Sequence, residues 1–489
     1  MKSEKWTKKD AKRCIQAGSK HLEKYVNPGF QAGATSKKRY LYFEGRDLIA
    51  PIFLFNLNTE NFNMKKISLA ICLLSVSFLQ AQNIDKIINA KEVERIEKVL
   101  SADDMQGRRT FTPGIEKAAN FIAEEFKQAG LQTWKNSGSY LQEFAMVKPK
   151  FISATCSFDN VSVDTKDVIV VTSKADLTIT EASNYERTTI ATGANLFSEA
   201  SKLIQSGKNY LVTVDTSFAK SFSRLTGFKR QLFKSETSVV FVLATQQPKT
   251  FSISAKHEIA EQKLSNVIAV IPGKSKKNEY VIFSGHYDHL GIGKAVNNDS
   301  IYNGANDDAA GTTAMIMLSK YFQAKKDNER TLIFVAFTAE EIGGFGAQYC
   351  SRQFNAIDVK AMFNIEMIGT ESKWGKNSAY ITGYEKTDMG KILQENLSGT
   401  GFTFYPDPYT DQNLFYRSDN ATLARLGVPA HTISTSKMDS EPNYHKVSDE
   451  IGTLDMDNMA MIIKAIALSS KGIISGKDTP SRVDVSGLK

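Results

Sequence analysis

The sequence predicts an α/β fold with a mostly parallel sheet and an inserted β-rich subdomain. From residue 264 onward, apolar runs alternate with helical patterns, which is typical of a parallel sheet covered by helices. Between 148 and 262 the pattern changes to short β-branched runs separated by polar turns, with no cluster of candidate ligands. The runs expected to form buried strands of the α/β part are "NVIAVIPG", "EYVIFSGHYD", "RTLIFVAFTAEE", "AMFNIEMIG" and "VPAHTIS".

Helical patterns surround these runs. Residues 82–135 are expected to be helical, and "TPGIEKAANFIAEEFKQAGLQ" has Pro113 near a helix start and Gly130 at its end. Its apolar stripe, which we expect to pack on the core, consists of Ile115, Ala118, Ala119, Ile122 and Phe126. Further helices that separate the expected strands lie near 309–324, 342–353, 388–399, 418–427 and 455–473.

The charge of the chain is unevenly distributed. The 489 residues carry a formal net charge of +8, with 42% apolar and 23% charged residues. Residues 1–66 hold 14 of the 61 Lys and Arg but 6 of the 53 Asp and Glu, which leaves 47 of each for 67–489. A neutral main body has no basic field to attract polyanions, so no nucleic-acid partner is expected.

The excess positive charge lies before and within a segment that resembles a secretory signal. "MKKISLAICLLSVSFLQAQ" begins at Met64 with two lysines, continues with about a dozen mostly apolar residues, and reaches Ala81-Gln82. The apolar stretch is too short for a comfortable membrane span. We therefore expect a signal peptide over 64–81, export to the periplasm or the medium, and no stable membrane span after cleavage. Residues 1–63 are then an upstream extension from a misplaced start codon.

The remaining chain divides into four expected parts. Residues 82–147 form the first part of the main domain, 148–262 the β-rich insert, 263–475 the rest of the main domain, and 476–489 a tail. Two cysteines of the mature chain, Cys156 and Cys350, are far apart in the sequence. They either form one disulfide or remain two unrelated buried thiols.

Polar residues repeatedly follow the apolar runs. His286 and Asp288 follow "YVIFSG", Glu340 and Glu341 follow "LIFVAFTA", and Glu366 follows "AMFNI". Ligands of α/β proteins gather where strands end. A pair such as Glu340-Glu341 can simply begin a helix, and Asp307-Asp308 can cap one. Together with His445 in a late loop, however, these side chains supply the imidazoles and carboxylates that a two-zinc site needs.

These motifs, in their order, resemble the di-zinc aminopeptidase family of the MH clan, of the bacterial leucyl aminopeptidase and glutamate carboxypeptidase type. The matching motifs are "GHYDHLG", "GANDDAAG", "AFTAEEIGGFGA", "NIEMIG" and "YHKVSDE", and the resemblance covers roughly 264–470 and the helix at 113–130. It implies a three-layer, zinc exopeptidase-like α/β fold with two Zn²⁺ per chain. The insert resembles the protease-associated domain that many members carry.

The resemblance also assigns roles to individual residues. His286 and Glu366 would bind one zinc, Glu341 and His445 the other, and Asp307 would bridge the two. Glu340 would be the general base, and Asp288 a second catalytic carboxylate that fixes the His286 ring. His289 would be no ligand, and Asp308 a turn or cap residue.

Glu366 departs from the commonest family pattern, which has Asp at this position. The extra methylene lengthens the side chain by ~1.5 Å, whereas zinc–oxygen distances are held near ~2.0–2.2 Å. The strand or the metal must therefore shift slightly, or Glu366 coordinates through a single oxygen.

The expected function is an exported aminopeptidase or dipeptidase that acts on peptide substrates. Two alternatives remain open at this point. The first is a glutaminyl cyclase of similar fold with one zinc, which would need a small aromatic pocket. The second is a non-catalytic binding ectodomain that has kept the fold, which would be expected to lack ligands. The sequence does not determine the oligomeric state.

Overall fold

Four apolar runs form the parallel centre of one sheet. In this computed structural model, which describes residues 84–486, β11 (Lys276–His286) lies between β14 (Arg330–Phe337) and β15 (Val359–Ile365), and both pairs are parallel. The strand β18 (Ala430–Ser434) continues the parallel run beside β15. The expected extension over 1–63 and the signal peptide over 64–81 lie outside the described residues.

Antiparallel strands extend this centre on both sides. The sheet order is β17-β16-β18-β15-β11-β14-β10-β2-β3, and the pairs β16–β18, β14–β10 and β10–β2 are antiparallel. A separate hairpin pairs β12 (Gly291–Val296) with β13 (Asp299–Tyr302). The predicted α/β fold with a mixed sheet is therefore confirmed. The remaining strands of the large sheet are β1 (Gln132–Thr133), β2 (Leu141–Phe158), β3 (Val161–Ser162), β5 (Asp176–Thr180), β8 (Leu232–Phe233), β10 (Phe251–Ile271), β16 (Ser378–Ile381) and β17 (Thr403–Pro406).

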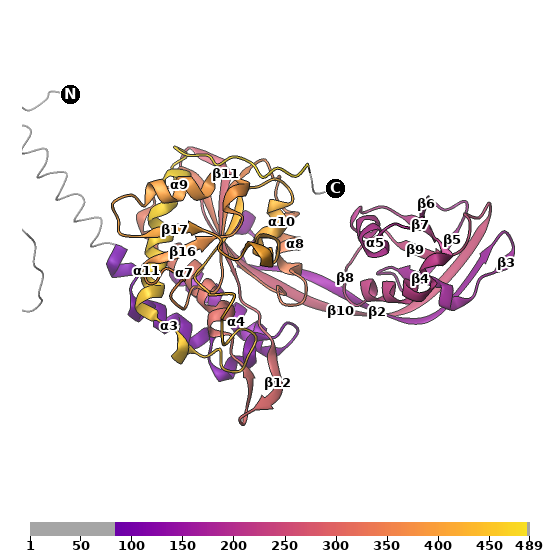
Figure 1. The fold of residues 1–489 in the computed structure, drawn as a ribbon, viewed down its shortest axis with the longest axis horizontal. Coiled ribbons are helices and arrows are strands. Elements are labelled where there is room, and N and C mark those ends of the chain that lie inside the picture. The colour runs from indigo at the N-terminus through magenta and orange to yellow at the C-terminus, as the bar shows by residue number, and fades with distance from the viewer. Residues whose placement is uncertain (1–83, 487–489) are drawn as a thin grey trace, which may run out of the picture. The chain divides into compact units, whose positions relative to one another are not determined.

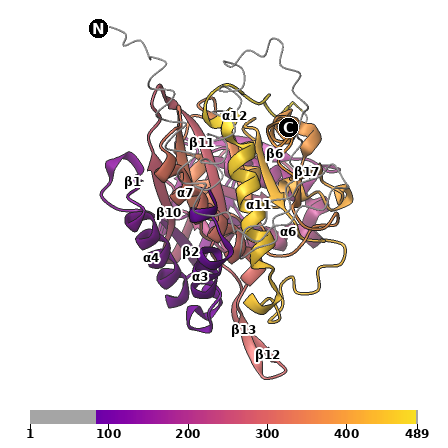
Figure 2. The ribbon, with the colours of Figure 1, turned by 90° about the vertical axis from the view of Figure 1, so that its left-hand side faces the viewer.

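Helices cover both faces of the sheet and give three layers. Figure 2 shows α3, α4, α7 and α11 on one side, and Figure 1 shows α8 and α10 beside the other side. No helix within residues 84–486 has the length and apolar character needed to span a membrane. The helices of the first side are α3 (Ala90–Leu100), α4 (Pro113–Gln128), α7 (Ala310–Lys325), α9 (Met389–Asn396) and α11 (Met456–Ser469). Those of the second side are α8 (Phe345–Ser351) and α10 (Asn420–Ala424), and the short α12 (Lys471–Ile474) follows α11.

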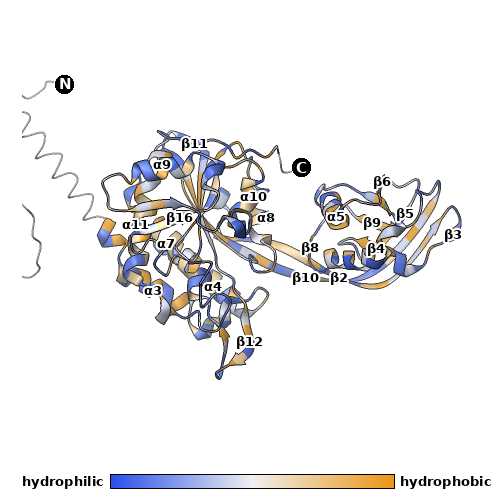
Figure 3. Cartoon of the chain, viewed as in Figure 1, coloured by the Kyte–Doolittle hydropathy of each residue, from blue (hydrophilic) through white to orange (hydrophobic). Residues whose placement is uncertain are grey.

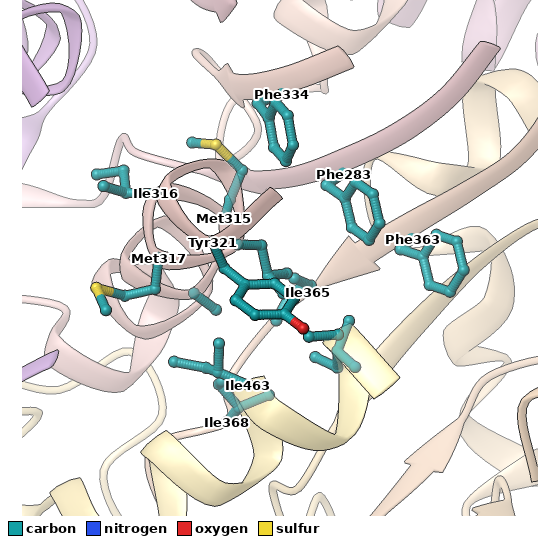
Figure 4. Close-up of a cluster of buried hydrophobic side chains, with 14 of the residues drawn as sticks. Phe283, Met315, Ile316, Met317, Tyr321, Phe334, Phe363, Ile365, Ile368 and Ile463 are labelled. Atoms are coloured by element: carbon teal, nitrogen blue, oxygen red, sulfur yellow. The ribbon is translucent and has the colours of Figure 1, made fainter. Parts of the chain in front are cut away.

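Alternation along the central strands divides the apolar side chains between two cores. Phe283 of β11 stacks against Phe334 of β14 and Phe363 of β15, with ring centroids 5.5 and 4.8 Å apart (Figure 4). The neighbouring Ile282 belongs to the opposite core, under α8 and α10. Because successive side chains of a strand point to opposite faces, a continuous apolar run indicates a strand that is covered on both sides.

The helix α4 follows the sequence pattern closely. It begins at Pro113, whose missing N–H costs nothing at the first position of a helix. The five residues of the predicted stripe are all buried, and they join the core beneath the sheet. Figure 3 shows hydrophobic and hydrophilic residues alternating along α3 and α4, as expected for helices with one face in water.

The long strands β2 and β10 connect the main sheet with a second folded region, which we call the insert lobe (residues 148–262). The lobe contains a four-stranded sheet of order β4-β9-β7-β6. One apolar core lies between this sheet and the strands β5 and β10, and another lies beneath α5 and α6. The strands β2 and β10 run through the expected edges at 148 and 262 without a break. The other elements of the lobe are β4 (Val168–Val171), β6 (Glu186–Ile190), β7 (Tyr210–Val214), β9 (Val239–Leu243), α5 (Leu196–Gln205) and α6 (Ala219–Phe222).

The two described cysteines do not pair. Cys156 lies in β2 and Cys350 in α8, and both are buried free thiols. Burial raises the pKa of the Cys156 thiol to about 11 and that of Cys350 to about 12. The alternative of two unrelated buried thiols is thus confirmed, and neither is activated for chemistry.

Candidate metal centre

The side chains singled out from the sequence meet at the carboxyl ends of the parallel strands. His286 is the last residue of β11, and Glu366 directly follows β15. Glu340 and Glu341 follow β14 after a two-residue turn. Asp307 lies in a tight turn (Ala305–Ala309) that leads into α7. Loops at one end of a parallel sheet thus bring residues 80 positions apart into one cluster.

One group of potential metal ligands consists of His286, Asp307 and Glu366. Each offers a ligand atom, and the three atoms lie within 4.8 Å of one another. The Nε2 atom of His286 is 3.2 Å from Oδ1 of Asp307. Glu366 therefore reaches the group in spite of its extra methylene.

A second group of potential ligands shares Asp307 with the first. It contains Glu341 and His289, again with ligand atoms within 4.8 Å. His289 Nδ1 lies 2.8 Å from Glu341 Oε1, so the histidine that the resemblance leaves outside the ligand set lies inside this cluster. His445 also reaches it, with Nε2 at 3.2 Å from both Asp307 Oδ2 and Glu341 Oε2.

The Asp288 side chain makes different contacts from those expected. Its Oδ1 lies 3.9 Å from Nδ1 of His286, and that nitrogen is instead 3.1 Å from the backbone carbonyl oxygen of Asp288. The carboxylate accepts the backbone N–H groups of Glu340 at 3.0 Å and Glu341 at 3.3 Å. Asp288 thus fixes the glutamate loop, and its carbonyl orients the imidazole.

Asp308 connects three elements beneath the cluster. Its carboxylate accepts N–H groups from His286 at 3.1 Å, from Gly311 at 3.0 Å and from Met367 at 3.0 Å. The bond to Gly311 caps the start of α7, as the sequence suggested, and the other two hold the ends of β11 and β15. A Cβ at Gly311 would collide with the carbonyl of Ile365, so only glycine permits this close approach.

Two positioning residues were missed by the sequence reasoning. Asp449 accepts the N–H groups of Asn306 at 2.8 Å and Asp307 at 3.0 Å. The fully buried Arg108 donates to the carbonyls of Tyr287 at 2.9 Å and Gly304 at 2.8 Å. Asp449 stands inside the quoted "YHKVSDE" motif, four residues after His445, and that was its only signal. Arg108 had none.

The buried charges around the cluster indicate that it requires a cation. Burial raises the pKa of Glu340 well above its usual range, and the neighbouring carboxylates of Glu366, Asp419 and Asp288 add to this. Burial acts in the same direction on Asp307, but the imidazoles of His286 and His445 outweigh it and hold the Asp307 pKa below its usual range. A divalent ion would compensate such an excess of carboxylates.

The unsatisfied atoms identify where a cation fits. Nε2 of His286, Nε2 of His289 and Oδ2 of Asp307 are buried and have no partner in hydrogen-bond geometry, although His286 and His445 each approach Asp307 to 3.2 Å. Buried polar atoms are nearly always paired, and imidazole and carboxylate atoms that share one small space are the ligands zinc prefers. The donor set therefore fits a zinc site.

A pocket that is partly open to solvent adjoins the cluster at Glu366. Tyr444 is among its lining residues, and its ring stacks on His445 with centroids 4.0 Å apart. Asp419 follows the lining residue Ser418 and is the last residue before α10. Its side chain makes no capping hydrogen bond, and both oxygens are buried without a partner.

Comparison with known proteins gives one family match. Residues 266–469 match the model described as peptidase family M28. A probable leucine aminopeptidase of Trichophyton verrucosum is 26% identical over 261 residues, which cover 49% of this chain and 68% of that protein. Leucine aminopeptidase 1 of Pyrenophora tritici-repentis is 29% identical over 40% of this chain and 52% of its own length.

Other relatives are matched over shorter parts or at lower identity. A probable zinc metalloprotease of Pyricularia oryzae is 29% identical over 112 residues, or 22% of either chain. Among solved structures, an aminopeptidase from Aneurinibacillus sp. strain AM-1 is 17% identical with a TM-score of 0.47, covering 83% of this chain and 97% of that one. A Bacteroides thetaiotaomicron glutaminyl cyclase bound to N-acetylhistamine is 14% identical with a TM-score of 0.43, covering 80% and 99%.

Proposed function

The chain belongs to peptidase family M28 as a hydrolase of the metallo-aminopeptidase type, and from this premise we propose that it removes amino-terminal residues from peptides with two zinc ions. One observation carries the proposal: Asp307 belongs to both groups of potential ligands. Two dications that are only ~3.5–4 Å apart must share negative charge, and a carboxylate between them supplies it.

The two ions would be held by different sets of side chains. His286, Asp307 and Glu366 would hold the first, and Asp307, Glu341 and His445 the second. His289 is a further candidate at the second position, because it contacts Glu341. Bound zinc supplies a Lewis acid that lowers the pKa of water and polarises the scissile carbonyl.

The chain itself supplies the proton transfer. The Glu340 carboxylate accepts a proton from the attacking water and donates it to the nitrogen of the leaving amine. Asp288 keeps Glu340 in place through its backbone N–H.

Replacing Glu340 by glutamine tests this assignment. Glu340→Gln keeps the size of the side chain and removes the base, so we expect kcat to fall by at least ~10²–10⁴-fold while zinc content stays at two per chain. The measurements are the hydrolysis of aminoacyl p-nitroanilides and elemental analysis after dialysis. Glu258→Gln, an exposed position in the insert lobe, is the matched control. Wild-type kcat in Glu340→Gln would show that the base lies elsewhere.

Zinc content separates the remaining alternatives. About two ions per purified chain support the aminopeptidase, whereas one would favour the single-zinc glutaminyl cyclase. A folded protein that binds no added zinc would favour the non-catalytic ectodomain. Export through the segment beginning at Met64 is a separate proposal that rests on the sequence. Amino-terminal sequencing of the native protein should begin near Gln82, and residues from 1–63 at the mature terminus would contradict it.

A further inference from the structure

An unpaired arginine lies in the pocket beside Glu366. Arg417 follows a short 3₁₀ turn (Leu414–Tyr416), and its backbone N–H donates to the carbonyl of Leu414 at 3.1 Å. Its guanidinium group is exposed, and within residues 84–486 it forms no ion pair or hydrogen bond. Both Arg417 and Glu366 line the pocket, so Arg417 borders the same space as the first proposed metal position.

Arg417 is the only basic residue among the described residues that line this pocket. The one acidic lining residue, Glu366, is already assigned to a metal ion. Lys437, the neighbour of the lining residue Met438, is 3.8 Å from Glu371 and is paired with it. With metal in place, the pocket therefore carries one uncompensated positive charge.

Two hydroxyl groups of the pocket are already engaged within the protein. The Thr432 hydroxyl donates to Oδ1 of Asn420 at 3.0 Å, and the Ser434 hydroxyl donates to the carbonyl of Met367 at 3.2 Å. The remaining walls include apolar side chains such as Leu414 and Met438. The five N–H donors of Arg417 are the charged donors that a substrate would meet here.

We propose that Arg417 determines specificity by binding a carboxylate of the substrate. This inference rests on the proposed aminopeptidase function. A guanidinium group matches a carboxylate with two parallel hydrogen bonds, and an aliphatic group placed against it would desolvate the charge without compensation. The carboxylate comes either from the side chain of an amino-terminal Asp or Glu, or from the free carboxyl terminus of a dipeptide. Both lie within a few bonds of the scissile peptide.

Four substrates separate these sources in the zinc-loaded full chain. Glutamyl and leucyl p-nitroanilide differ in the side-chain carboxylate, and Leu-Gly and Leu-Gly-amide differ in the terminal carboxylate. In Arg417→Gln we expect kcat/KM to fall about 10- to 100-fold for the carboxylate-bearing member of one pair. The neutral member should change less than about threefold. The affected pair identifies the source of the carboxylate.

Arg425→Gln is the matched control. Arg425 lies eight residues away, and its guanidinium covers the ring of Tyr416 at 5.3 Å instead of lining the pocket. This variant removes the same charge from the same region and should leave both pairs of substrates unchanged. An equal loss for all four substrates in Arg417→Gln, or no loss for any, would overturn the proposal.

A binding measurement makes the result independent of turnover. Calorimetric titration of the zinc-loaded wild type should show tighter binding of glutamate than of glutamine, or of glycylglycine than of glycylglycine amide. Arg417→Gln should abolish that preference. If the wild type prefers the carboxylate but hydrolyses none of the four substrates, the proposed function fails while the assignment of Arg417 stands. If binding shows no preference in an active enzyme, the assignment of Arg417 fails alone.

Discussion

Charged side chains are exposed in the insert lobe but buried around the metal centre, although β10 runs through the lobe and into the main sheet. In the lobe, ion pairs such as Lys150–Glu258 and Lys208–Glu186 have side chains that are 55–78% exposed. Around the metal centre, Asp288, Asp307 and Asp308 are at most 2% exposed. The lobe keeps its charges in water and buries apolar side chains, whereas the body buries carboxylates.

The difference shows what stabilises each region. Exposed ion pairs contribute little, so the lobe depends on its two small apolar cores. Buried carboxylates cost free energy unless hydrogen bonds and cations compensate them. The N–H groups bound by Asp288, Asp308 and Asp449 offset part of this cost, and bound metal would offset the rest. Lobe mutations should therefore act on packing, and mutations in the body should act on metal affinity.

The largest effect is expected from a cavity in the lobe. Phe241 of β9 is fully buried beneath α5, and Phe241→Ala should destabilise the lobe by ~3–5 kcal/mol. Hydrogen exchange of peptides covering β7 and β9 measures this. The described tryptophans, Trp134 and Trp374, both lie outside the lobe, so tryptophan fluorescence follows the body separately. If hydrogen exchange in the lobe and tryptophan fluorescence of the body report equal destabilisation, the lobe and the body unfold as one unit.

A smaller effect should follow from loosening the backbone at the metal centre. Each Asp449 oxygen accepts one N–H, from Asn306 and from Asp307. Asp449→Asn replaces one acceptor by a donor, so the turn that carries Asp307 should shift, and zinc affinity should fall about 10- to 100-fold. Competition with a chromogenic chelator measures the affinity. Unaltered zinc affinity would show that the contacts of Asp449 stabilise the fold without affecting the metal site. The hydrogen-exchange rates of the insert lobe in the same variant are the control.

The smallest effect concerns pH and a histidine of the lobe. Burial, with a contribution from Lys229, lowers the pKa of His257 to about 4, whereas an unfolded histidine titrates near 6.5. The unfolded chain therefore binds the proton first, and this contribution to stability is lost as pH falls from about 6.5 toward 4. Its size at pH 5 should be on the order of 1–2 kcal/mol.

His257→Leu tests that effect, because both ring nitrogens of His257 lack a partner and an apolar side chain can replace them. The lobe of this variant should keep its stability between pH 6.5 and 5, as judged by hydrogen exchange corrected for intrinsic rates. If the wild type and the variant lose stability equally over this range, other groups of the lobe are responsible.

The sequence predicted the elements of the body because their patterns are local. Apolar runs such as the one before His286 mark strands, and Pro113 marks a helix start, without any information from distant residues. Three motifs at strand ends, with one before a helix and one in a late loop, likewise predicted which side chains would meet. The course of β2 and β10 was not predictable, because their polar middle portions resemble turns and become strand only through pairing with each other.

Parts of the site were unpredictable for a related reason. The roles of Asp288 and Asp449 depend on backbone N–H groups of loops that are distant in sequence, and no side-chain pattern records such contacts. The contact between His289 and Glu341 depends on the angle at which one loop leaves β11. Residue type and spacing therefore predict the members of a cluster more readily than the contacts within it.

The contacts of Arg108 indicate which residues a shortened peptidase must retain. The family match begins at residue 266, yet this guanidinium, more than 150 positions earlier, gathers carbonyls from Leu100, Tyr287, Asn303 and Gly304. A fragment that begins at residue 266 would leave the carbonyl oxygens of Tyr287, Asn303 and Gly304 without their hydrogen-bond donor. The peptidase domain is thus discontinuous in the sequence, because it needs residues that precede the insert lobe, such as Arg108, as well as those that follow it.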